Sequence, residues 1–354
     1  FGKNLNISAS QLEKFNLCRF SYFCNYGLNV RGRQRAEINP MQYGTIVHYI
    51  LERFFGEYTK EEYLSLEEDK FQKIVCAYLA EYAVKYFGEE QLESNSFTYR
   101  LKTILDNVMY LMKHIMEELS QSEFFVADCE LKIGEDIPSY TIVLPDGHKI
   151  AVCGSVDRVD IMQRADITYL RIIDYKTGTK QFKLSDILYG INLQMLLYLH
   201  SIEASGGDKY GEIVPAGILY MPATVPYISS DSLKSIDKLP DELNKKLKMN
   251  GLLLKDTEII HGMDKTDAAT YIPVKIKAGE PVSSTSLATL AEFGKIFKKV
   301  DMLIAEMGKN IYNGNIEAKP LKGGHDSCEY CPYDSVCAYR QSNPITCFSV
   351  DNKT

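Results

Sequence analysis

The sequence predicts an α/β protein in which helices flank a mixed central sheet. The first segments of the chain have the pattern of helices. They are followed by several β-rich segments that are separated by turns such as Pro145-Asp146-Gly147. A further helix separates these strands from one more short, apolar strand. This order of elements is typical of a mixed sheet with helices on its faces.

Two helices open the chain. Ser8 is available to cap the first, which contains Leu12 and Phe15 and ends near Cys18. Pro40 stands in the first turn of the second, whose apolar residues repeat at helical spacing, with His48 on the flank of that stripe.

The remaining elements follow from changes in the period of the apolar pattern. Residues 60–121 are almost entirely helical, which we interpret as a helical insertion, and residues 223–283 give no clear assignment. The other expected elements are strands at 124–133, 140–144, 149–160, 168–176 and 216–221, and helices at 185–204 and 284–312. We expect one domain over residues 1–354, with a cysteine-rich segment at 318–347.

Composition narrows the class of protein. The 354 residues are 45% hydrophobic and 25% charged, and no apolar run is long enough to span a membrane. The net charge of −7 argues against indiscriminate nucleic-acid binding, although local basic groups could still line a channel. These groups are Arg31, Arg33 and Arg35, and Lys176, Lys180 and Lys183.

Nine cysteines, an odd number, do not indicate a disulfide framework in a chain without a secretory leader. A reducing compartment is the better interpretation, and we expect the cytoplasm. The chain begins without Met, which suggests that it is part of a longer protein.

The most informative residues are carboxylates that interrupt apolar strands. Asp157 and Asp174 lie on segments separated by a single hairpin, so both side chains can converge on one point. Buried carboxylates need a cationic partner, and a hard divalent cation with oxygen ligands is an obvious one. Lys176 lies two residues beyond Asp174 and therefore on the same face of the strand. The alternative is a pair of salt bridges, Asp157 with Arg158 or a neighbour and Asp174 with Lys176.

This set suits phosphodiester hydrolysis, which needs an activated water and neutralisation of phosphate charge. Gln194 and Tyr198 share one helix face and could contact phosphate or DNA. His48 is a candidate nitrogen ligand for the same cation, and Glu130 is a further, weaker candidate. Ordinary packing would equally account for each of these four residues alone.

A second constellation consists of thiols. Cys328, Cys331 and Cys337 form a compact set that needs a fourth ligand to complete a metal centre. Cys18 is the best candidate, and Cys24 and Cys347 compete with it. The alternative is zinc held by the three cysteines and His325, because spacing alone does not separate zinc from iron.

Together these strings resemble the RecB-like branch of the PD-(D/E)xK nuclease superfamily. The matching pieces are Gly44-Thr45-x-x-His48, Gly154-Ser155-Val156-Asp157-Arg158-Val159-Asp160, Asp174-Tyr175-Lys176-Thr177-Gly178 and Gln194-x-x-x-Tyr198. The cysteines resemble the version of this nuclease whose ends are joined by an iron–sulfur cluster, as in AddAB-type helicase–nucleases.

The resemblance implies roles for these residues. His48, Asp157, Asp174 and the backbone carbonyl of Tyr175 would bind Mg²⁺ (or Mn²⁺). Lys176 would be the catalytic lysine, and Gln194 and Tyr198 would lie beside the DNA. The ligands of a [4Fe–4S] cluster would be Cys18, Cys328, Cys331 and Cys337.

The resemblance also implies partners: DNA, as a single strand at an unwound end, and an AddA-type helicase subunit. No Gly-x-x-x-x-Gly-Lys-Ser/Thr loop is present, so we expect no direct ATP binding by this chain. Two alternatives are a free-standing iron–sulfur exonuclease of the same superfamily and a catalytically idle scaffold that binds DNA or a partner.

Overall fold

The computed structural model describes most of the chain. The described residues are 2–30, 40–178, 181–225, 239–266, 269–277, 279–282, 285–323, 326–337, 339 and 344–347. The arginines of the predicted basic stretch at 31–35, Lys180, His325 and the side chain of Cys347 lie outside them.

The core is a six-stranded mixed sheet, which confirms the predicted fold class. Its strands lie in the order β11-β8-β7-β6-β5-β2, and the pairs β6–β7 and β8–β11 are parallel whereas the others are antiparallel. The strands are β2 (Phe125–Ile133), β5 (Gly154–Arg164), β6 (Ile167–Lys176), β7 (Glu212–Pro222), β8 (Asn250–Leu254) and β11 (Leu287–Ala288).

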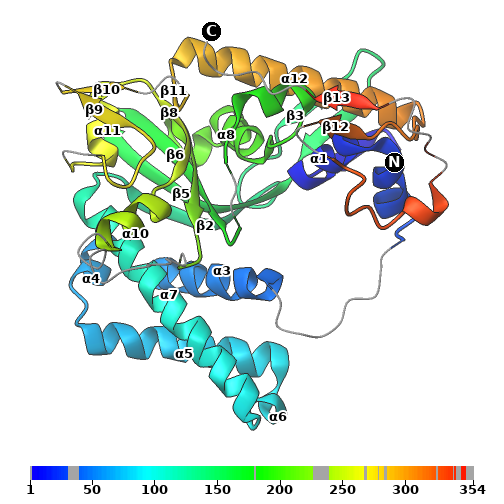
Figure 1. The fold of residues 1–354 in the computed structure, drawn as a ribbon. Coiled ribbons are helices and arrows are strands. Elements are labelled where there is room, and N and C mark those ends of the chain that lie inside the picture. Colours follow the sequence, from blue (N-terminus) through cyan, green and yellow to red (C-terminus); the bar gives the residue numbers. More distant parts are fainter. Residues whose placement is uncertain are drawn as a thin grey trace.

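Helices cover both faces of this sheet (Figure 1). Helix α8 (Gln194–Ser205) connects β6 to β7 and packs on both, and α12 (Leu290–Tyr312) and α1 (Ala9–Leu17) pack behind it. Helix α3 (Pro40–Glu57) packs against β2 and β6 from the other side. Because both faces are covered, β6 is almost continuously buried, and the charged residues within it need buried partners.

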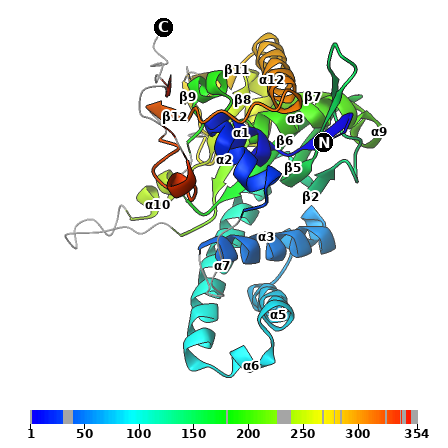
Figure 2. The ribbon, with the colours of Figure 1, turned by 90° about the vertical axis from the view of Figure 1, so that its right-hand side faces the viewer.

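The helical character of residues 60–121 is confirmed. The segment forms α4 (Lys60–Leu64), α5 (Glu68–Phe87), α6 (Glu89–Leu92) and α7 (Asn95–Gln121). Helices α5 and α7 pack against each other and against α3, and they project away from the sheet (Figure 2). The sequence from α3 to β2 thus adds a helical layer on the side of the sheet where α3 lies.

Three predicted elements have different boundaries. The expected strand at 149–160 is interrupted at Cys153, so that β4 (Lys149–Val152) joins β1 (Asn4–Ile7) and β3 (Thr141–Val143) in a separate sheet. The expected helix at 185–204 is divided into the 3-10 helix η2 (Leu184–Tyr189) and α8, because Gly190 has a left-handed φ of 71°. Helix α12 begins six residues later than predicted, where Thr289 caps it.

Residues 223–283, which the sequence left unassigned, contribute small elements around β8. These are α10 (Leu239–Leu247), α11 (Thr257–Met263), β9 (Lys275–Lys277) and β10 (Glu280–Val282). The remaining elements are α2 (Arg19–Tyr22), the π-helix η1 (Phe23–Gly27), α9 (Gly207–Tyr210), β12 (Leu321–Gly323), the 3-10 helix η4 (Asp334–Val336) and β13 (Ile345–Cys347).

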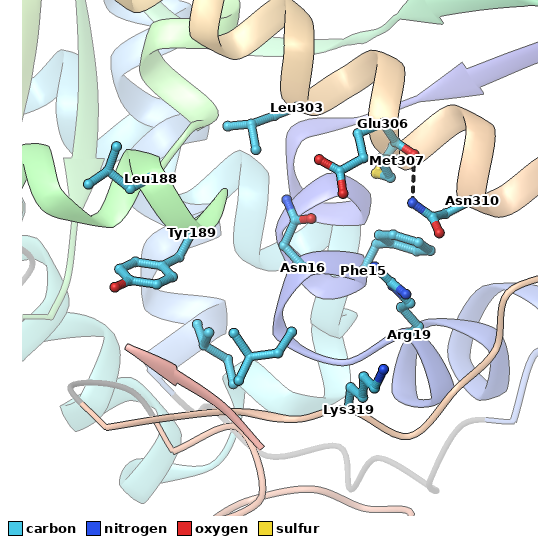
Figure 3. Close-up of a pocket in the computed structure, with 12 residues that line it drawn as sticks. Phe15, Asn16, Arg19, Leu188, Tyr189, Leu303, Glu306, Met307, Asn310 and Lys319 are labelled. Atoms are coloured by element: carbon cyan, nitrogen blue, oxygen red, sulfur yellow. Dashed lines mark hydrogen bonds between the residues drawn. The ribbon is translucent and has the colours of Figure 1, made fainter. Parts of the chain in front are cut away.

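The C-terminal segment lies against the first helices. The hydroxyl of Tyr333 donates a hydrogen bond of 2.8 Å to the carbonyl of Val30. A cavity of about 180 Å³ separates α1 from α12 and from the segment that follows it, with Phe15, Met307 and Lys319 among its walls (Figure 3). No helix in the described part of the chain is long and apolar enough to cross a membrane.

Candidate active site and cysteine-lined cavity

Three carboxylates lie in one row across neighbouring strands. On β2 and β5, Cys129 pairs with Arg158 and Leu131 pairs with Val156, which places Glu130 opposite Asp157. Strands β5 and β6 are antiparallel, and their pairing ends with Arg158 opposite Ile173. One step further along, Asp157 of β5 lies opposite Asp174 of β6. Strand pairing therefore gathers acidic side chains that are far apart in sequence.

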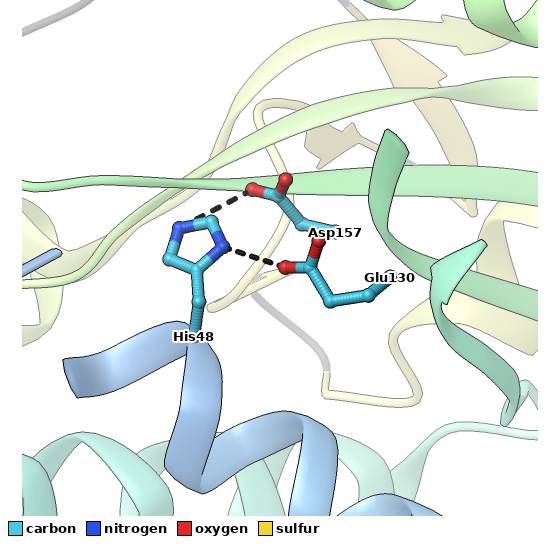
Figure 4. Close-up of side chains that lie close together, drawn as sticks. All are labelled: His48, Glu130 and Asp157. Atoms are coloured by element: carbon cyan, nitrogen blue, oxygen red, sulfur yellow. Dashed lines mark hydrogen bonds and ion pairs between the residues drawn. The ribbon is translucent and has the colours of Figure 1, made fainter. Parts of the chain in front are cut away.

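His48 reaches this row from α3. Its Nδ1 lies 2.9 Å from Glu130 Oε1, and its Nε2 lies 3.6 Å from Asp157 Oδ2 (Figure 4). One ligand atom from each of the three side chains lies within 4.8 Å of the others. The ring of His48 also meets the ring of Tyr175 edge-on, with 5.8 Å between centroids. The imidazole and two carboxylates thus form a compact set of potential metal ligands.

Glu130 enters this group through an irregular strand. Its φ of 51° lies in the left-handed region, which is uncommon for a residue with a side chain. The carboxylate also accepts a hydrogen bond of 2.8 Å from the hydroxyl of Ser155. Such backbone strain concentrates at functional sites, where the surrounding structure must hold it in place. The structure therefore gives Glu130 a larger part in the site than the sequence suggested.

Asp157 is in an environment that disfavours its negative charge. Burial, and secondly the nearby carboxylate of Asp174, raise the pKa of Asp157 to about 7, although His48 and the backbone N–H of Tyr175 act in the opposite direction. That N–H donates a hydrogen bond of 2.9 Å to Asp157 Oδ2. Burial alone would lower the pKa of His48, but Glu130, Asp157 and Asp174 raise it. A bound cation would compensate this excess of negative charge.

Asp174 and Lys176 share a face of β6, as the period of two predicted. The Nζ atom of Lys176 lies 2.5 Å from Asp174 Oδ2, and the carboxyl side chain of Asp174 is only 3% exposed. Within the described residues, the compact ligand group contains His48, Glu130 and Asp157 rather than Asp174. The ammonium of Lys176 balances the charge of Asp174, which explains how this carboxylate tolerates burial.

The donor set fits a divalent cation that accepts nitrogen and oxygen ligands. Carboxylates are the ligands that magnesium and manganese prefer, whereas imidazole is the more usual ligand of zinc, copper, iron and nickel. Of the two salt bridges in the alternative interpretation, the structure shows that of Asp174 with Lys176, and Asp157 faces His48 in place of Arg158. Arg158 contacts Asp160 and Glu118 instead, which leaves the carboxylate of Asp157 directed at His48.

Beneath this row lies a buried quartet of charges that the sequence reasoning missed: Glu118, Arg158, Asp160 and Arg171. Asp160 accepts hydrogen bonds of 2.8 Å from Arg158 and 3.0 Å from Arg171. Glu118, which comes from α7, accepts 3.2 Å and 2.6 Å hydrogen bonds from the same two guanidinium groups. Arg158 also donates to the hydroxyl of Tyr175 at 3.3 Å. The quartet thus joins the helical insertion to the strands that carry the candidate ligands.

Gln194 and Tyr198 both lie on α8, but Tyr198 is buried. Gln194 is the first residue of the helix and is half-buried, whereas Tyr198 is 5% exposed. A Cβ atom added to Gly154, whose φ is +157°, would lie 2.2 Å from the Tyr198 hydroxyl. This close approach explains the glycine at the start of β5. Burial raises the pKa of the Tyr198 hydroxyl, and the carboxylates of Asp157 and Asp174 are near enough to raise it further.

The predicted cluster ligands lie around one cavity of about 160 Å³, which Cys18, Cys328, Cys331 and Cys337 all line. Burial raises the pKa of the Cys18 thiol, and the thiols of Cys337 and Cys331 raise it further. Cys24 lies close enough to these thiols for them to raise its pKa as well, after the effect of burial. The structure therefore brings residues from both ends of the chain together, with Cys24 beside them.

The chain belongs to the PD-(D/E)XK nuclease superfamily, whose characteristic sequence it matches over residues 6–338. This superfamily consists of nucleases, and the row of carboxylates with Lys176 lies within the matched region.

The chain is also similar in sequence to B subunits of the ATP-dependent helicase/deoxyribonuclease, which are of the AddB type. The chain is 35% identical over 347 residues to this subunit of Thermoanaerobacter sp., with 95% of the chain and 30% of the relative aligned. The identity to the subunit of Clostridium kluyveri is 36% over 359 residues, with 97% and 31% aligned. That of Ruminiclostridium cellulolyticum is 33% identical over 363 residues, with 98% and 31% aligned. The chain therefore spans about a third of the length of these relatives.

Proposed function

We propose that the chain is a Mg²⁺- or Mn²⁺-dependent nuclease that hydrolyses phosphodiester bonds of a single DNA strand. The single observation that carries this proposal is the group of His48, Glu130 and Asp157, next to the Asp174–Lys176 pair, in a member of a nuclease superfamily. A divalent cation held there would neutralise phosphate charge and lower the pKa of an attacking water.

The protein side chains have separate tasks in this proposal. His48, Asp157 and Glu130 provide ligand atoms, with Asp174 and the Tyr175 carbonyl as further candidates. Lys176 lies with its ammonium on the same face as Asp174, where it would stabilise negative charge that develops on the phosphate. Gln194 begins α8 and would contact the DNA strand, whereas buried Tyr198 packs against Gly154 and would hold the start of β5 in place.

We further propose that Cys18, Cys328, Cys331 and Cys337 hold a [4Fe–4S] cluster. The four thiols line one cavity, together with other residues of the first helices and the C-terminal segment. Four thiolates suit either tetrahedral zinc or an iron–sulfur cluster. The resemblance to the iron–sulfur version of this nuclease is what favours iron, and the role of the cluster would be to join the two ends of a single nuclease domain.

The names of the relatives support a place in a helicase–nuclease, because each is a helicase/deoxyribonuclease subunit. We propose an AddA-type helicase subunit as partner, which would feed an unwound single strand to this site for exonucleolytic trimming during repair of DNA ends. The proposed compartment is the cytoplasm, and ATP would be bound elsewhere in the complex.

The test is cleavage of an end-labelled single-stranded oligonucleotide. The protein should degrade it with Mg²⁺ or Mn²⁺ and stop when EDTA is added. Asp174→Ala should abolish cleavage while the far-ultraviolet circular dichroism spectrum stays unchanged. Cleavage by the Asp174→Ala protein at the wild-type rate would contradict the assignment. An iron assay with an ultraviolet–visible spectrum tests the cluster separately, and a colourless protein with one zinc per chain would refute it.

A further inference from the structure

A groove of about 690 Å³ opens beside the candidate metal ligands. One side is formed by His48, Glu130 and Lys176, and the other by Tyr82 and Tyr86 of α5, with Tyr49 of α3 between them. We propose that these three tyrosines, the tyrosine shelf, form an aromatic surface for unstacked bases of the single DNA strand that enters the site, with the exposed ring of Tyr86 as the ring that contacts them. This inference deepens the proposed function and rests on it for the identity of the substrate.

The three rings of the tyrosine shelf contact one another in series, with the partly exposed Tyr49 and the exposed Tyr86 on either side of the buried Tyr82. The centroids of Tyr49 and Tyr82 are 5.2 Å apart, and those of Tyr82 and Tyr86 are 4.4 Å apart with 35° between the ring planes. Tyr82 is 5% exposed whereas Tyr86 is 55% exposed. The series of rings thus ends on an aromatic side chain that is open to a ligand. Every base has a π-face that can stack on such a ring.

The shelf is held in place by polar contacts on its outer side. The hydroxyl of Tyr49 donates a hydrogen bond of 2.7 Å to Glu81, and Arg53 donates one of 3.0 Å to the same carboxylate oxygen. Because these contacts fix the ring of Tyr49 before any ligand arrives, less conformational entropy is lost on binding.

The charged side chains around the shelf indicate on which side the backbone of a bound DNA strand would run. Lys85 Nζ lies near the shelf, 5.2 Å from the ring centroid of Tyr86 and 6.0 Å from that of Tyr49, and Lys132 is one of the residues that line the groove. These ammonium groups can attract the phosphates of a DNA strand that passes beside the rings. The carboxylates of Glu52 and Glu130 line the same groove and would repel phosphate. The arrangement therefore favours bases on the rings and the backbone along the lysines.

Continuity with the candidate active site favours a single strand over a duplex. Lys176, Thr177 and Gly178 line the same groove as Tyr86, so a strand whose bases rest on the shelf can extend toward the candidate ligands. Inside a duplex the base faces are covered by their neighbours, and only a single strand offers them for stacking. Helix α5, which packs against α3, thereby gives the helical insertion a role in substrate choice (Figure 2).

The experiment measures binding without cleavage. A fluorescein-labelled oligothymidylate is titrated with the protein in EDTA, and the same titration is made with an abasic strand of equal length. Tyr86→Ala should weaken oligothymidylate binding on the order of tenfold, whereas Tyr86→Phe should bind as the wild type does. Tyr99→Ala is the matched control, because Tyr99 belongs to the same helical insertion, is 73% exposed and does not line the groove.

The outcomes separate this inference from the proposed function. Equal affinities of wild type and Tyr86→Ala for oligothymidylate would overturn the tyrosine shelf, and the rings would then be a surface for another protein chain. Equal loss of affinity for the abasic strand would overturn it too, because the lost contact would not involve bases. If Tyr86→Ala fails to fold, weaker binding by Tyr86→Leu than by Tyr86→Phe supports stacking, and equal binding refutes it. Selective loss of base-dependent binding in a protein that does not cleave DNA would uphold the shelf and refute the nuclease.

Discussion

The buried quartet gives a stability prediction whose size can be worked out from the structure. Glu118, Arg158, Asp160 and Arg171 have no exposed side-chain surface, and their two positive and two negative charges balance. Burial alone would raise the pKa of Asp160, but Arg158 and Arg171 lower it below its ordinary value. Glu118→Gln keeps the size of the side chain and leaves two guanidinium groups facing one carboxylate.

An uncompensated buried charge of this kind costs about 3–5 kcal/mol. That is a large part of the free energy of unfolding of a domain, which is about 5–15 kcal/mol. Urea denaturation followed by circular dichroism should therefore show a markedly lower midpoint for Glu118→Gln. Adding Arg171→Met restores neutrality, so the double variant should recover part of the loss.

The control is Glu68→Gln, which removes the exposed ion pair between Glu68 of α5 and Lys113 of α7, the helix that also carries Glu118. Exposed pairs contribute little, so this change should leave the midpoint nearly unchanged. If Glu118→Gln were no more destabilising than Glu68→Gln, the reasoning about the quartet would be wrong.

Three further predictions concern the site and the cavity. Glu130→Gln should weaken Mn²⁺ binding by on the order of tenfold in calorimetric titration, and an unchanged affinity would remove Glu130 from the ligand set. Gly154→Ala should destabilise the protein by about 1–3 kcal/mol, because its Cβ meets the Tyr198 hydroxyl. That cost should shrink in a Tyr198→Leu background, and additive costs in urea denaturation would argue against the clash. Cys331→Ala should lose iron, colour and thermal stability whereas Cys76→Ala, on α5, keeps them, and equal iron content in both would exclude Cys331 as a ligand.

The sequence predicted the candidate site best where the relevant side chains lie on one strand. Asp174 and Lys176 are two residues apart, so the period of a strand alone places them together, and the ion pair confirms it. Similarly, hairpin-related strands bring Asp157 next to Asp174. The fold class was predictable for the same reason, because it depends on the order of elements and not on their packing.

From the sequence, Glu130 was only a weaker candidate and Glu118 was not indicated, because the partners of both residues are set by long-range packing. Between β2 and β5 lie the strands of another sheet, so no local pattern tells which residue of β2 faces Asp157. Glu118 meets its arginines only after α7 packs on the central sheet. One clue was available: Arg158 and Arg171 each interrupt an apolar strand, and a charge in such a place requires a buried partner.

The central claim is that this site binds a divalent cation and uses it to cleave DNA. Its most direct test is Mn²⁺ titration by calorimetry of the wild type and Asp157→Asn, beside cleavage of a labelled single strand by the same samples. We predict that Asp157→Asn loses both Mn²⁺ binding and cleavage, and that it unfolds at no lower urea concentration without metal, because a disfavoured buried charge is gone. Wild-type Mn²⁺ affinity and cleavage in Asp157→Asn would contradict the account.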